Sequence, residues 1–341
     1  MTHDPQSGAS KQTIEQIHER IIAFPQRFKN EIGKIIIGQE EILDLMIISL
    51  FCNGHVLITG VPGLAKTLLV KTVASLFHLD FNRIQCTPDL MPSDIIGVEI
   101  LDDAVHGLER KFRFVRGPVF TNLLLADEIN RTSPRTQAAL LQAMQEKEIT
   151  VVGTTHSLQA PFIVFATQNP IDSEGTYLLP EAQLDRFLFN IFIDYPSLEQ
   201  EIEIASLAPL DNGNATQSLL GHDDLIQFQR LVHDLPIPRH LVQWIVKFVR
   251  ATRPQESEDD DVKRFVEWGA GVRASQSIVL ASKAKALLSG HNVVSSEDIQ
   301  SVLLPVLRHR IIINFVGEAE TWNSDRIIQN LMEKHSFSFS D

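Results

Sequence analysis

Residues 60–67 read GVPGLAKT, and they stand between an apolar run at residues 55–59 and an apolar segment that begins at Leu68. When a loop of this kind joins a strand to a helix, its backbone N–H groups and the helix N-terminus wrap around phosphate groups. The lysine of the pattern neutralises the β- and γ-phosphates of a nucleotide, and the hydroxyl after it ligates Mg²⁺. The sequence therefore predicts a phosphate-binding loop made of Gly60, Val61, Pro62, Gly63, Leu64, Ala65, Lys66, Thr67 and Leu68, with Thr67 as a metal ligand.

One residue departs from the phosphate-loop pattern, because Ala65 stands where the pattern has its last glycine. This position opens the helix, where right-handed dihedral angles suit alanine, so we expect phosphate binding to survive. The alternative is a glycine-containing turn that Lys66 and Thr67 follow by chance. The strand-like run before the loop argues against it.

Residues 122–128 read NLLLADE, an apolar run that ends in two carboxylates. Such a run is typical of a strand buried on both faces of a parallel sheet, and ligands of these sheets bind at the carboxyl edge. We expect Asp127 to hold Mg²⁺ through its water shell and Glu128 to polarise the attacking water. The pair alone is a weak signal. Its position downstream of Lys66, with room for a strand and a helix between, makes it strong.

Length and composition indicate a globular protein of two domains, because the chain has 341 residues of which 44% are hydrophobic. The first twelve residues lack an apolar signal core, and the longest apolar stretch, residues 45–51, is too short to span a bilayer. We therefore expect a cytoplasmic protein without membrane insertion. The net charge of −13 counts against a protein that coats nucleic acid, although it does not exclude a local basic surface that binds one.

The remaining compositional features favour ordinary structural interpretations. The cysteines, Cys52 and Cys86, are expected to be small buried hydrophobic residues, and the twelve histidines show no spacing typical of zinc sites. The acidic residues 256–261 predict a solvated, mobile loop, with a partner-binding role as the alternative.

The order of the predicted elements gives an α/β core followed by a helical domain. Two amphipathic helices, residues 13–24 and 40–51, precede the loop, and Pro25 is expected to end the first. Five strands are expected at residues 55–59, 81–85, 122–126, 162–167 and 187–193. Helices are expected around residues 198–206, 223–234, 239–250, 275–289 and 296–309, with an exposed connection at 209–221. The predicted domains are residues 1–195, with a parallel α/β sheet, and residues 196–341, all helical.

Three further polar residues are candidates for a hydrolytic site. Asn169 follows the fourth strand and is expected to orient water or touch the γ-phosphate, although Asn before Pro is also a common turn. Arg186 could reach a phosphate from a neighbouring subunit, and the alternative is a local ion pair with Asp185 or Glu181. Arg273 is expected in the first turn of a helix, where a cation opposes the helix dipole and so hints at a facing anion. A plain surface arginine is the alternative there.

The motifs GVPGLAKT, LLLADEINR, ATQNP, LPEAQLDRF and GAGVRAS, in this order, resemble those of AAA+ ATPases, and within them the MoxR-type ATPases. The resemblance covers about residues 30–309. It implies a P-loop NTPase core with a five-stranded parallel sheet of order 5-1-4-3-2, a helical lid, and an ATP site with Mg²⁺ at the interfaces of a ring that is usually hexameric. The resemblance also implies a role for each motif residue. Lys66 and Thr67 would belong to the first nucleotide motif, and Asp127 and Glu128 to the second. Asn169 would be the first sensor, Arg186 the arginine finger and Arg273 the second sensor, while Gly38 and Gln39 would lie beside the adenine and Arg131 would be a second residue that faces the neighbouring subunit.

Two insertions resemble hairpins of the same AAA+ clade. In residues 105–118 basic and apolar residues alternate, like the hairpin that points towards the central pore in this clade. Residues 148–156 alternate in the same way and resemble the hairpin before the first sensor. A plain hairpin with one wet face is the equal alternative for the first insertion.

The first functional hypothesis is an ATPase that couples hydrolysis to chaperone-like remodelling or maturation of a protein partner. MoxR-type relatives often act with proteins that carry von Willebrand factor A domains. The alternative from another class is a nucleic-acid motor or helicase loader, which the alternating arginines between residues 110 and 116 favour and the net acidity opposes. A third hypothesis, a switch that binds ATP without hydrolysis, is opposed by Glu128 and Arg186.

Overall fold

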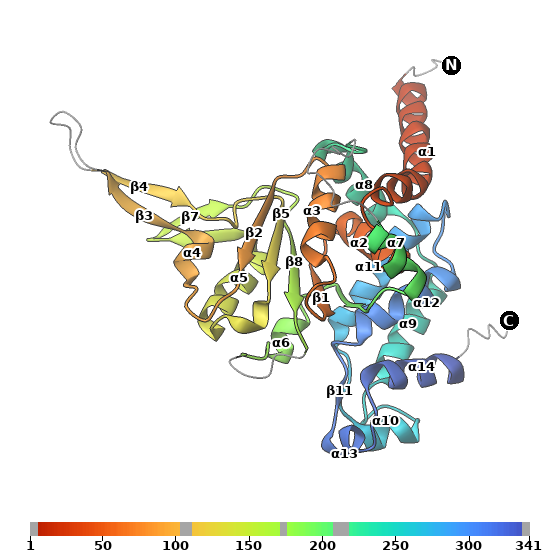
Figure 1. Cartoon of the computed structure of the whole chain (residues 1–341). Helices are drawn as coiled ribbons and strands as arrows, with labels where there is room; N and C mark the ends of the chain where they lie inside the picture. Colours follow the sequence, from red (N-terminus) through yellow and green to blue (C-terminus); the bar gives the residue numbers. More distant parts are fainter. Residues whose placement is uncertain (1–5, 103–110, 171–175, 207–217, 336–341) are drawn as a thin grey trace.

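The computed structural model describes residues 6–102, 111–170, 176–206 and 218–335. A central sheet, two projecting hairpins and a helical region make up the molecule (Figure 1). In the part of the chain that is described, no helix combines the length and apolar character needed to cross a membrane.

The central sheet has five parallel strands in the order β2-β5-β8-β1-β9. Counted as the first to fifth core strands along the chain, this is the predicted order 5-1-4-3-2 read from the other edge, so the prediction is confirmed. The strands are β1 (Val56–Gly60), β2 (Phe81–Gln85), β5 (Leu123–Asp127), β8 (Ile163–Gln168) and β9 (Phe189–Ile193).

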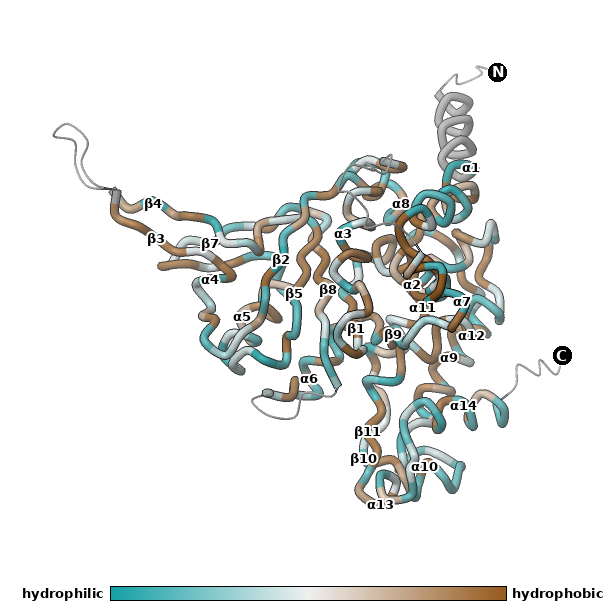
Figure 2. Tube along the Cα trace, viewed as in Figure 1, coloured by the Kyte–Doolittle hydropathy of each residue, from teal (hydrophilic) through white to brown (hydrophobic). Residues whose placement is uncertain are grey.

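Helices cover both faces of this sheet, because its central strands are apolar on both faces. Leu123 and Leu125 pack in the hydrophobic cluster that includes α2 and α3, and Leu124 packs in the cluster with α5. Figure 2 shows how hydrophobic these central strands are. The helices of the core are α2 (Glu40–Phe51), α3 (Lys66–Leu76), α4 (Pro92–Ile96), the 3-10 helix η1 (Ile129–Arg131), α5 (Pro134–Glu146) and α6 (Glu181–Leu184).

Helix α1 (Gln6–Ile32) runs past Pro25, so the prediction that Pro25 ends it is wrong. The cause is packing. Phe24, Phe28 and Ile32, spaced by four residues, are buried and continue the apolar stripe across the proline. The rings of Phe24 and Phe28 lie 5.7 Å apart, and the burial of the three side chains together offsets the hydrogen bond that proline removes.

The second part of the chain is helical, as predicted, with one short β pairing that the sequence did not predict. Strand β10 (Val266–Trp268) pairs antiparallel with β11 (Ile312–Ile313). The helices are α7 (Leu198–Ser206), α8 (His222–Asp234), α9 (Arg239–Ala251), α10 (Asp260–Phe265), α11 (Val272–Leu288), α12 (Ser296–Leu307), α13 (Phe315–Ala319) and α14 (Ser324–Lys334). Most of the predicted connection at 209–221 lies outside the described residues. The division at residue 195 stays a prediction.

The end of the acidic segment is more ordered than predicted, because Asp259 is the N-cap of α10 and the helix begins at Asp260. The Asp259 carboxylate caps this helix by accepting from the N–H groups of Asp261 and Val262. Lys334 Nζ lies 2.6 Å from Asp259 Oδ2, which ties α14 to the same cap. A cap and an ion pair thus order residues 259–261, where a mobile loop was expected.

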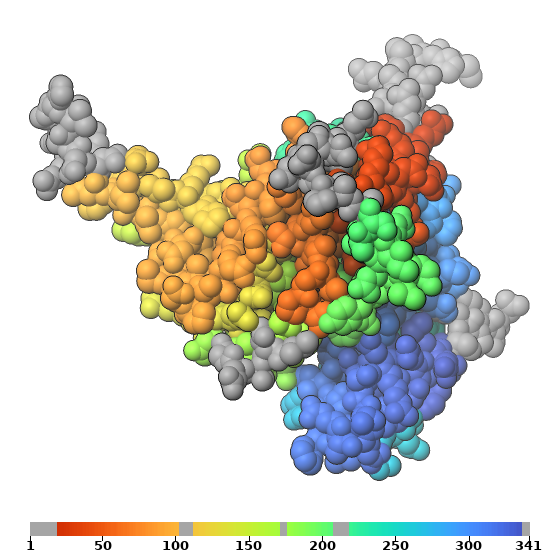
Figure 3. Space-filling model, in the orientation of Figure 1, coloured from red at the N-terminus to blue at the C-terminus, as the bar shows by residue number. Residues whose placement is uncertain are grey.

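Two antiparallel hairpins project from one side of the sheet, as Figures 1 and 3 show. The first consists of β3 (Gly97–Asp102) and β4 (Lys111–Arg116), so the partner of the alternating basic strand lies upstream of the predicted range 105–118. Residues 103–110 lie outside the described residues. The second, β6 (Glu148–Val151) with β7 (Thr154–Ser157), is the hairpin predicted at 148–156. The Phe114 ring stacks on His156 with centroids 4.3 Å apart, which joins the two hairpins.

The end of α12 fastens the helical region to the sheet. The Arg310 guanidinium, only 2% exposed, donates through Nη2 to Phe187 O at 2.7 Å and through Nε to Asp185 Oδ1 at 2.8 Å. Arg308 donates to Asn190 O, and His309 Nε2 lies 3.1 Å from Phe187 O. The three side chains together hold the backbone between α6 and β9.

Both predicted cysteines, Cys52 and Cys86, are free and buried, and burial raises the pKa of both thiols.

Candidate active site

The predicted phosphate loop joins the end of β1 to the start of α3. Lys66 Nζ donates to Gly60 O at 2.6 Å, which curls the side chain back over the loop. Partial burial lowers the pKa of Lys66, while the charges of Asp127 and Glu128 oppose this shift. A Cβ at Gly60 would lie 2.6 Å from Ile193 O, so the close approach of β9 requires glycine at this position.

The backbone of Ala65 contradicts the expectation of right-handed dihedral angles. Its φ of 53° and ψ of 23° are left-handed, and it is the residue immediately before α3. The loop must reverse its curvature there to direct its N–H groups inward, which explains why the pattern carries glycine at this point. Gln39 and Glu128, two other predicted site residues, also have positive φ angles, of 61° and 57°. Strained backbone of this kind clusters at functional sites.

Asp127 lies at the carboxyl end of β5 with its side chain turned towards the phosphate loop. Thr67 Oγ1 lies 3.4 Å from Asp127 Oδ2. The other carboxylate oxygen, Oδ1, accepts a hydrogen bond of 2.5 Å from Thr167 Oγ1 on β8. The structure therefore brings the two predicted metal ligands together, and the side chain of a neighbouring strand anchors one of them.

Glu128 follows directly and points along the same edge of the sheet. Its N–H donates to Thr167 Oγ1 at 2.8 Å. Its Oε2 accepts from Gln85 Nε2 at 3.1 Å and lies 3.3 Å from Arg131 Nε. The two carboxylates therefore have different side-chain partners.

Three residues of this site were missed in the sequence: Arg83, Gln85 and Thr167. Arg83 Nη2 lies 2.7 Å and Nε 3.2 Å from Asp127 Oδ2. The signal for Arg83 and Gln85 was their spacing of two residues, which puts both on one face of a strand that the order 5-1-4-3-2 places beside residues 122–126. The signal for Thr167 was its position directly before the Gln168-Asn169 end of the next strand.

The other predicted catalytic residues come from the end of β8, the segment after α6 and the start of α11. Asn169 is buried at the end of β8, the strand next to β5. Arg273 Nη1, in the first turn of α11, lies 3.6 Å from Asp185 Oδ2. Asp185 also pairs with Arg310, and within the described residues no ion pair joins Arg186 to Asp185 or to Glu181. The local pair considered as an alternative for Arg186 is therefore not formed.

The predicted adenine-side residues, Gly38 and Gln39, connect α1 to α2. A Cβ at Gly38 would lie 2.5 Å from Gln200 Nε2, so the side chain of α7 packs directly over this turn. Gln39 O accepts from the N–H of Leu43 and so starts α2. The turn thus lies against the segment that follows β9, the neighbour of β1 in the sheet.

The donor set of the site fits a magnesium nucleotide. Lys66 supplies a half-buried ammonium, and Thr67 and Asp127 supply the oxygen ligands that Mg²⁺ prefers. The roles of the individual residues stay predictions.

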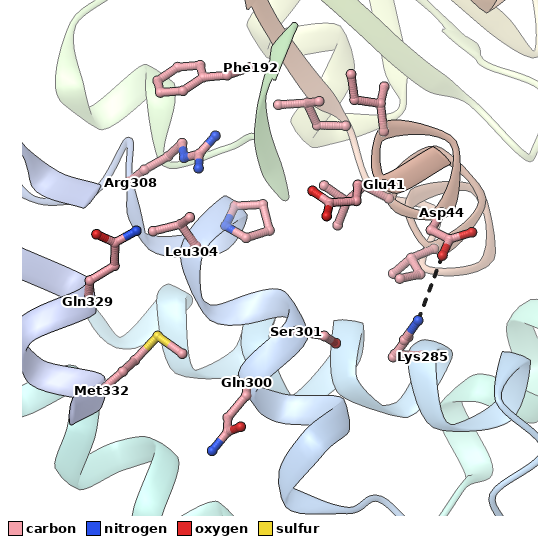
Figure 4. Close-up of a pocket in the computed structure, with 15 residues that line it drawn as sticks. Glu41, Asp44, Phe192, Lys285, Gln300, Ser301, Leu304, Arg308, Gln329 and Met332 are labelled. Carbon is pink, nitrogen blue, oxygen red and sulfur yellow. Dashed lines mark ion pairs between the residues drawn. The ribbon is translucent and has the colours of Figure 1, made fainter. Parts of the chain in front are cut away.

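A separate cleft of about 550 Å³ lies between α2 and the helical region. In Figure 4, Asp44 of α2 points towards Lys285 of α11, with 3.9 Å between Oδ2 and Nζ. On the opposite wall, the Arg308 guanidinium lies 4.1 Å from the ring centroid of Phe192. The residues that line this cleft do not include the phosphate loop, so it is distinct from the predicted nucleotide site.

Comparisons with known proteins match both parts of the chain. Residues 55–189 match the ATPase family associated with various cellular activities (AAA), and residues 258–331 match the AAA lid domain. The chain is 40% identical to Chaperone MoxR1 of Mycobacterium tuberculosis, over 97% of this chain and 85% of that protein. It is 29% identical to Protein MoxR of Paracoccus denitrificans, over 82% of this chain and 86% of that protein.

A comparison of the fold with solved structures agrees with the sequence comparisons. A crystal structure of a protein from Cytophaga hutchinsonii superposes with a TM-score of 0.85 and 38% identity, over 94% of this chain and 98% of that chain. Because the likeness to MoxR proteins extends over nearly the whole chain, the protein belongs to the AAA+ ATPases, in the MoxR-type group.

Proposed function

We propose that this protein hydrolyses ATP with Mg²⁺ and uses the energy for chaperone-like remodelling or maturation of a protein partner. Members of the AAA+ family hydrolyse ATP in general, and a relative is named Chaperone MoxR1. The proposal includes a homo-oligomeric ring, a hexamer by analogy with the family, a cytoplasmic location, and a von Willebrand factor A domain protein as the partner.

In this proposal each residue of the site has a separate task. Lys66 and the loop N–H groups bind the phosphates, and Thr67 with Asp127 hold the metal. When bound, Mg²⁺ neutralises the charge that grows on the phosphate oxygens. Glu128 accepts a proton from the attacking water, Asn169 orients that water, and Gly38 and Gln39 lie beside the adenine. Two arginines, Arg186 from the neighbouring subunit and Arg273 from the lid, stabilise the charge on the γ-phosphate.

The observation that carries this proposal is the short distance between Thr67 and Asp127. The hydroxyl comes from the start of α3, which follows β1, and the carboxylate comes from the end of β5; β8 separates these two strands in the sheet, yet the two groups approach within 3.4 Å. Glu128 follows at the same edge. A chance Lys-Thr after a turn would have no reason to face two acids in this way.

Replacement of the glutamate tests the proposal. Glu128→Gln should keep ATP bound and slow steady-state turnover by at least about a hundredfold, because the amide cannot accept the proton. ATP binding is measured with a fluorescent analogue and turnover by phosphate release. The matched control is Glu318→Gln, an exposed glutamate of α13, which should behave as the wild type.

Near-normal turnover of Glu128→Gln would contradict the assigned role. Turnover is also measured with single-stranded and duplex DNA, because stimulation by DNA would favour the motor hypothesis over the chaperone. The ATP-bound Glu128→Gln protein then serves to capture the partner from its native lysate.

A further inference from the structure

Arg83 forms a close ion pair with Asp127 in the candidate site, with 2.7 Å between Nη2 and Oδ2, although no motif includes it. It lies on β2, the edge strand next to β5, and two of its nitrogens point at one oxygen of Asp127. The Arg83 side chain is 46% exposed and the Asp127 side chain 12% exposed, so a half-exposed cation covers a nearly buried anion.

The two oxygens of the Asp127 carboxylate have different partners. Oδ1 accepts from Thr167 Oγ1 at 2.5 Å, and this bond fixes the carboxylate to β8 without help from Arg83. Oδ2 faces the phosphate loop, where Thr67 Oγ1 lies 3.4 Å away, and it is this oxygen that Arg83 contacts. Arg83 therefore contacts the carboxylate oxygen that faces Thr67, the other predicted metal ligand.

This division of partners argues against a purely orienting role for Arg83. An orienting residue would be needed where the carboxylate has no other anchor, and Thr167 already supplies one. Arg83 supplies positive charge instead. A nearly buried carboxylate without a cation has a high desolvation free energy, and a guanidinium at 2.7 Å offsets it.

We propose that Arg83 is a displaceable countercharge, which neutralises Asp127 in the nucleotide-free protein and competes with Mg²⁺ for the Oδ2 side of the carboxylate. Half of the Arg83 side chain is already in contact with solvent at the edge of the sheet, so it can leave Asp127 without disturbing the core. Because this inference assumes a magnesium nucleotide at Asp127, it depends on the proposed function.

The competition has a measurable consequence in the magnesium requirement. Removing the guanidinium removes a competitor, so the Mg²⁺ concentration that gives half-maximal binding of ADP should fall. We expect a fall of roughly three- to tenfold for Arg83→Gln, the size of one partly exposed charged hydrogen bond. Arg83→Lys keeps a cation and should stay within about twofold of the wild type.

The experiment titrates Mg²⁺ at fixed fluorescent ADP with the full chain. The matched control is Arg239→Gln, an exposed arginine at the start of α9, which should not change the titration. An unchanged or higher magnesium requirement for Arg83→Gln would overturn the inference. A wild-type protein that binds no nucleotide at any Mg²⁺ concentration would instead overturn the proposed function.

A second measurement uses the unsubstituted protein, in case Arg83→Gln does not fold. The NMR signal of the Arg83 Nε–H group, assigned with Arg83→Lys, reports its hydrogen bond to Asp127 directly. We expect the signal to shift and to exchange faster with water when ADP and Mg²⁺ are added together, but not with ADP alone. A signal that is unchanged by the magnesium nucleotide would overturn the inference.

Discussion

At residue 65 an alanine adopts the left-handed conformation that phosphate loops usually give to glycine. The Cβ atom makes this conformation unfavourable in free energy. The resulting strain lies in a loop that must already hold several N–H groups in one direction. The loop therefore keeps its shape at the expense of stability. An alanine here is compatible with the fold but is not the residue that minimises its free energy.

Ala65→Gly should raise the free energy of unfolding by about 0.5–1 kcal/mol, because glycine removes the left-handed strain and loses part of the gain as chain entropy. Chemical denaturation of the nucleotide-free protein measures this change. The control is Ala74→Gly at a buried position in the last turn of α3, which should lower stability by about 1 kcal/mol. A destabilised Ala65→Gly would show that the loop carries no strain at this residue.

At the scale of elements, buried apolar runs were the best guide to the fold. The predicted strand at residues 122–126 is β5, shifted by one residue, because a continuous apolar run has no good alternative to a doubly covered strand. Pro25 misled the prediction of α1, since the burial of Phe28 and Ile32 against other helices is not written in the local sequence.

Contacts between elements were the part of the site that could not be predicted. The motif residues Lys66, Thr67, Asp127 and Glu128 come together as expected, because the carboxyl ends of β1 and β5 lie at one edge of the parallel sheet and these residues lie at or after those ends. Arg83 and Thr167 reach Asp127 from the neighbouring strands, and only the register of the sheet decides which of their side chains meet. A single sequence carries no direct record of that register.

His55 links three elements, so the pairing of β1, β8 and α5 depends on its protonation. Its Nδ1 accepts from the N–H of Val164 at 3.0 Å, and Nε2 lies 3.1 Å from Met144 O, which it reaches as a donor. Burial lowers the pKa of His55 from 6.5 to about 4. A protonated ring would lose the acceptor that Val164 needs.

The direction of the pH effect follows from this lowered pKa. Between pH 6.5 and 4 the unfolded chain binds a proton at His55 that the folded chain does not bind, so stability is full above pH 6.5 and is lost as the pH falls towards 4. The loss from this one group should be roughly 2–3 kcal/mol between pH 7.5 and 4.5.

Urea unfolding across this pH range, with wild type and His55→Gln, checks the expectation. The variant should be less stable at pH 7.5 but should lose less stability on acidification, by the amount assigned to His55. Parallel pH profiles of the two proteins would contradict it. Other titrating groups contribute equally to both proteins and so do not affect the difference.

At the scale of the whole molecule, the proposed site is completed by a neighbouring subunit. A mixture of Arg186→Ala and Glu128→Gln subunits tests this, because each variant alone should be inactive. In mixed rings about a quarter of the interfaces combine an intact Glu128 with an intact Arg186 from the next subunit, so part of the ATPase activity should return. Activity is measured by phosphate release, and mixing is verified by native mass spectrometry.

No recovery in rings that are verified to be mixed would contradict the shared site. Full activity of Arg186→Ala on its own would do so as well. The control mixture joins two preparations of Glu128→Gln and should stay inactive.

Arg308, His309 and Arg310 have a mechanical consequence for such a ring. Their side chains are hydrogen-bonded to main-chain oxygens of Phe187 and Asn190. A rotation of the lid would therefore also move the backbone segment that starts at Asp185. Arg186 lies in that segment. In the proposed ring, a tilt of the lid at one nucleotide would therefore move the Arg186 guanidinium that the same protomer extends to the next nucleotide.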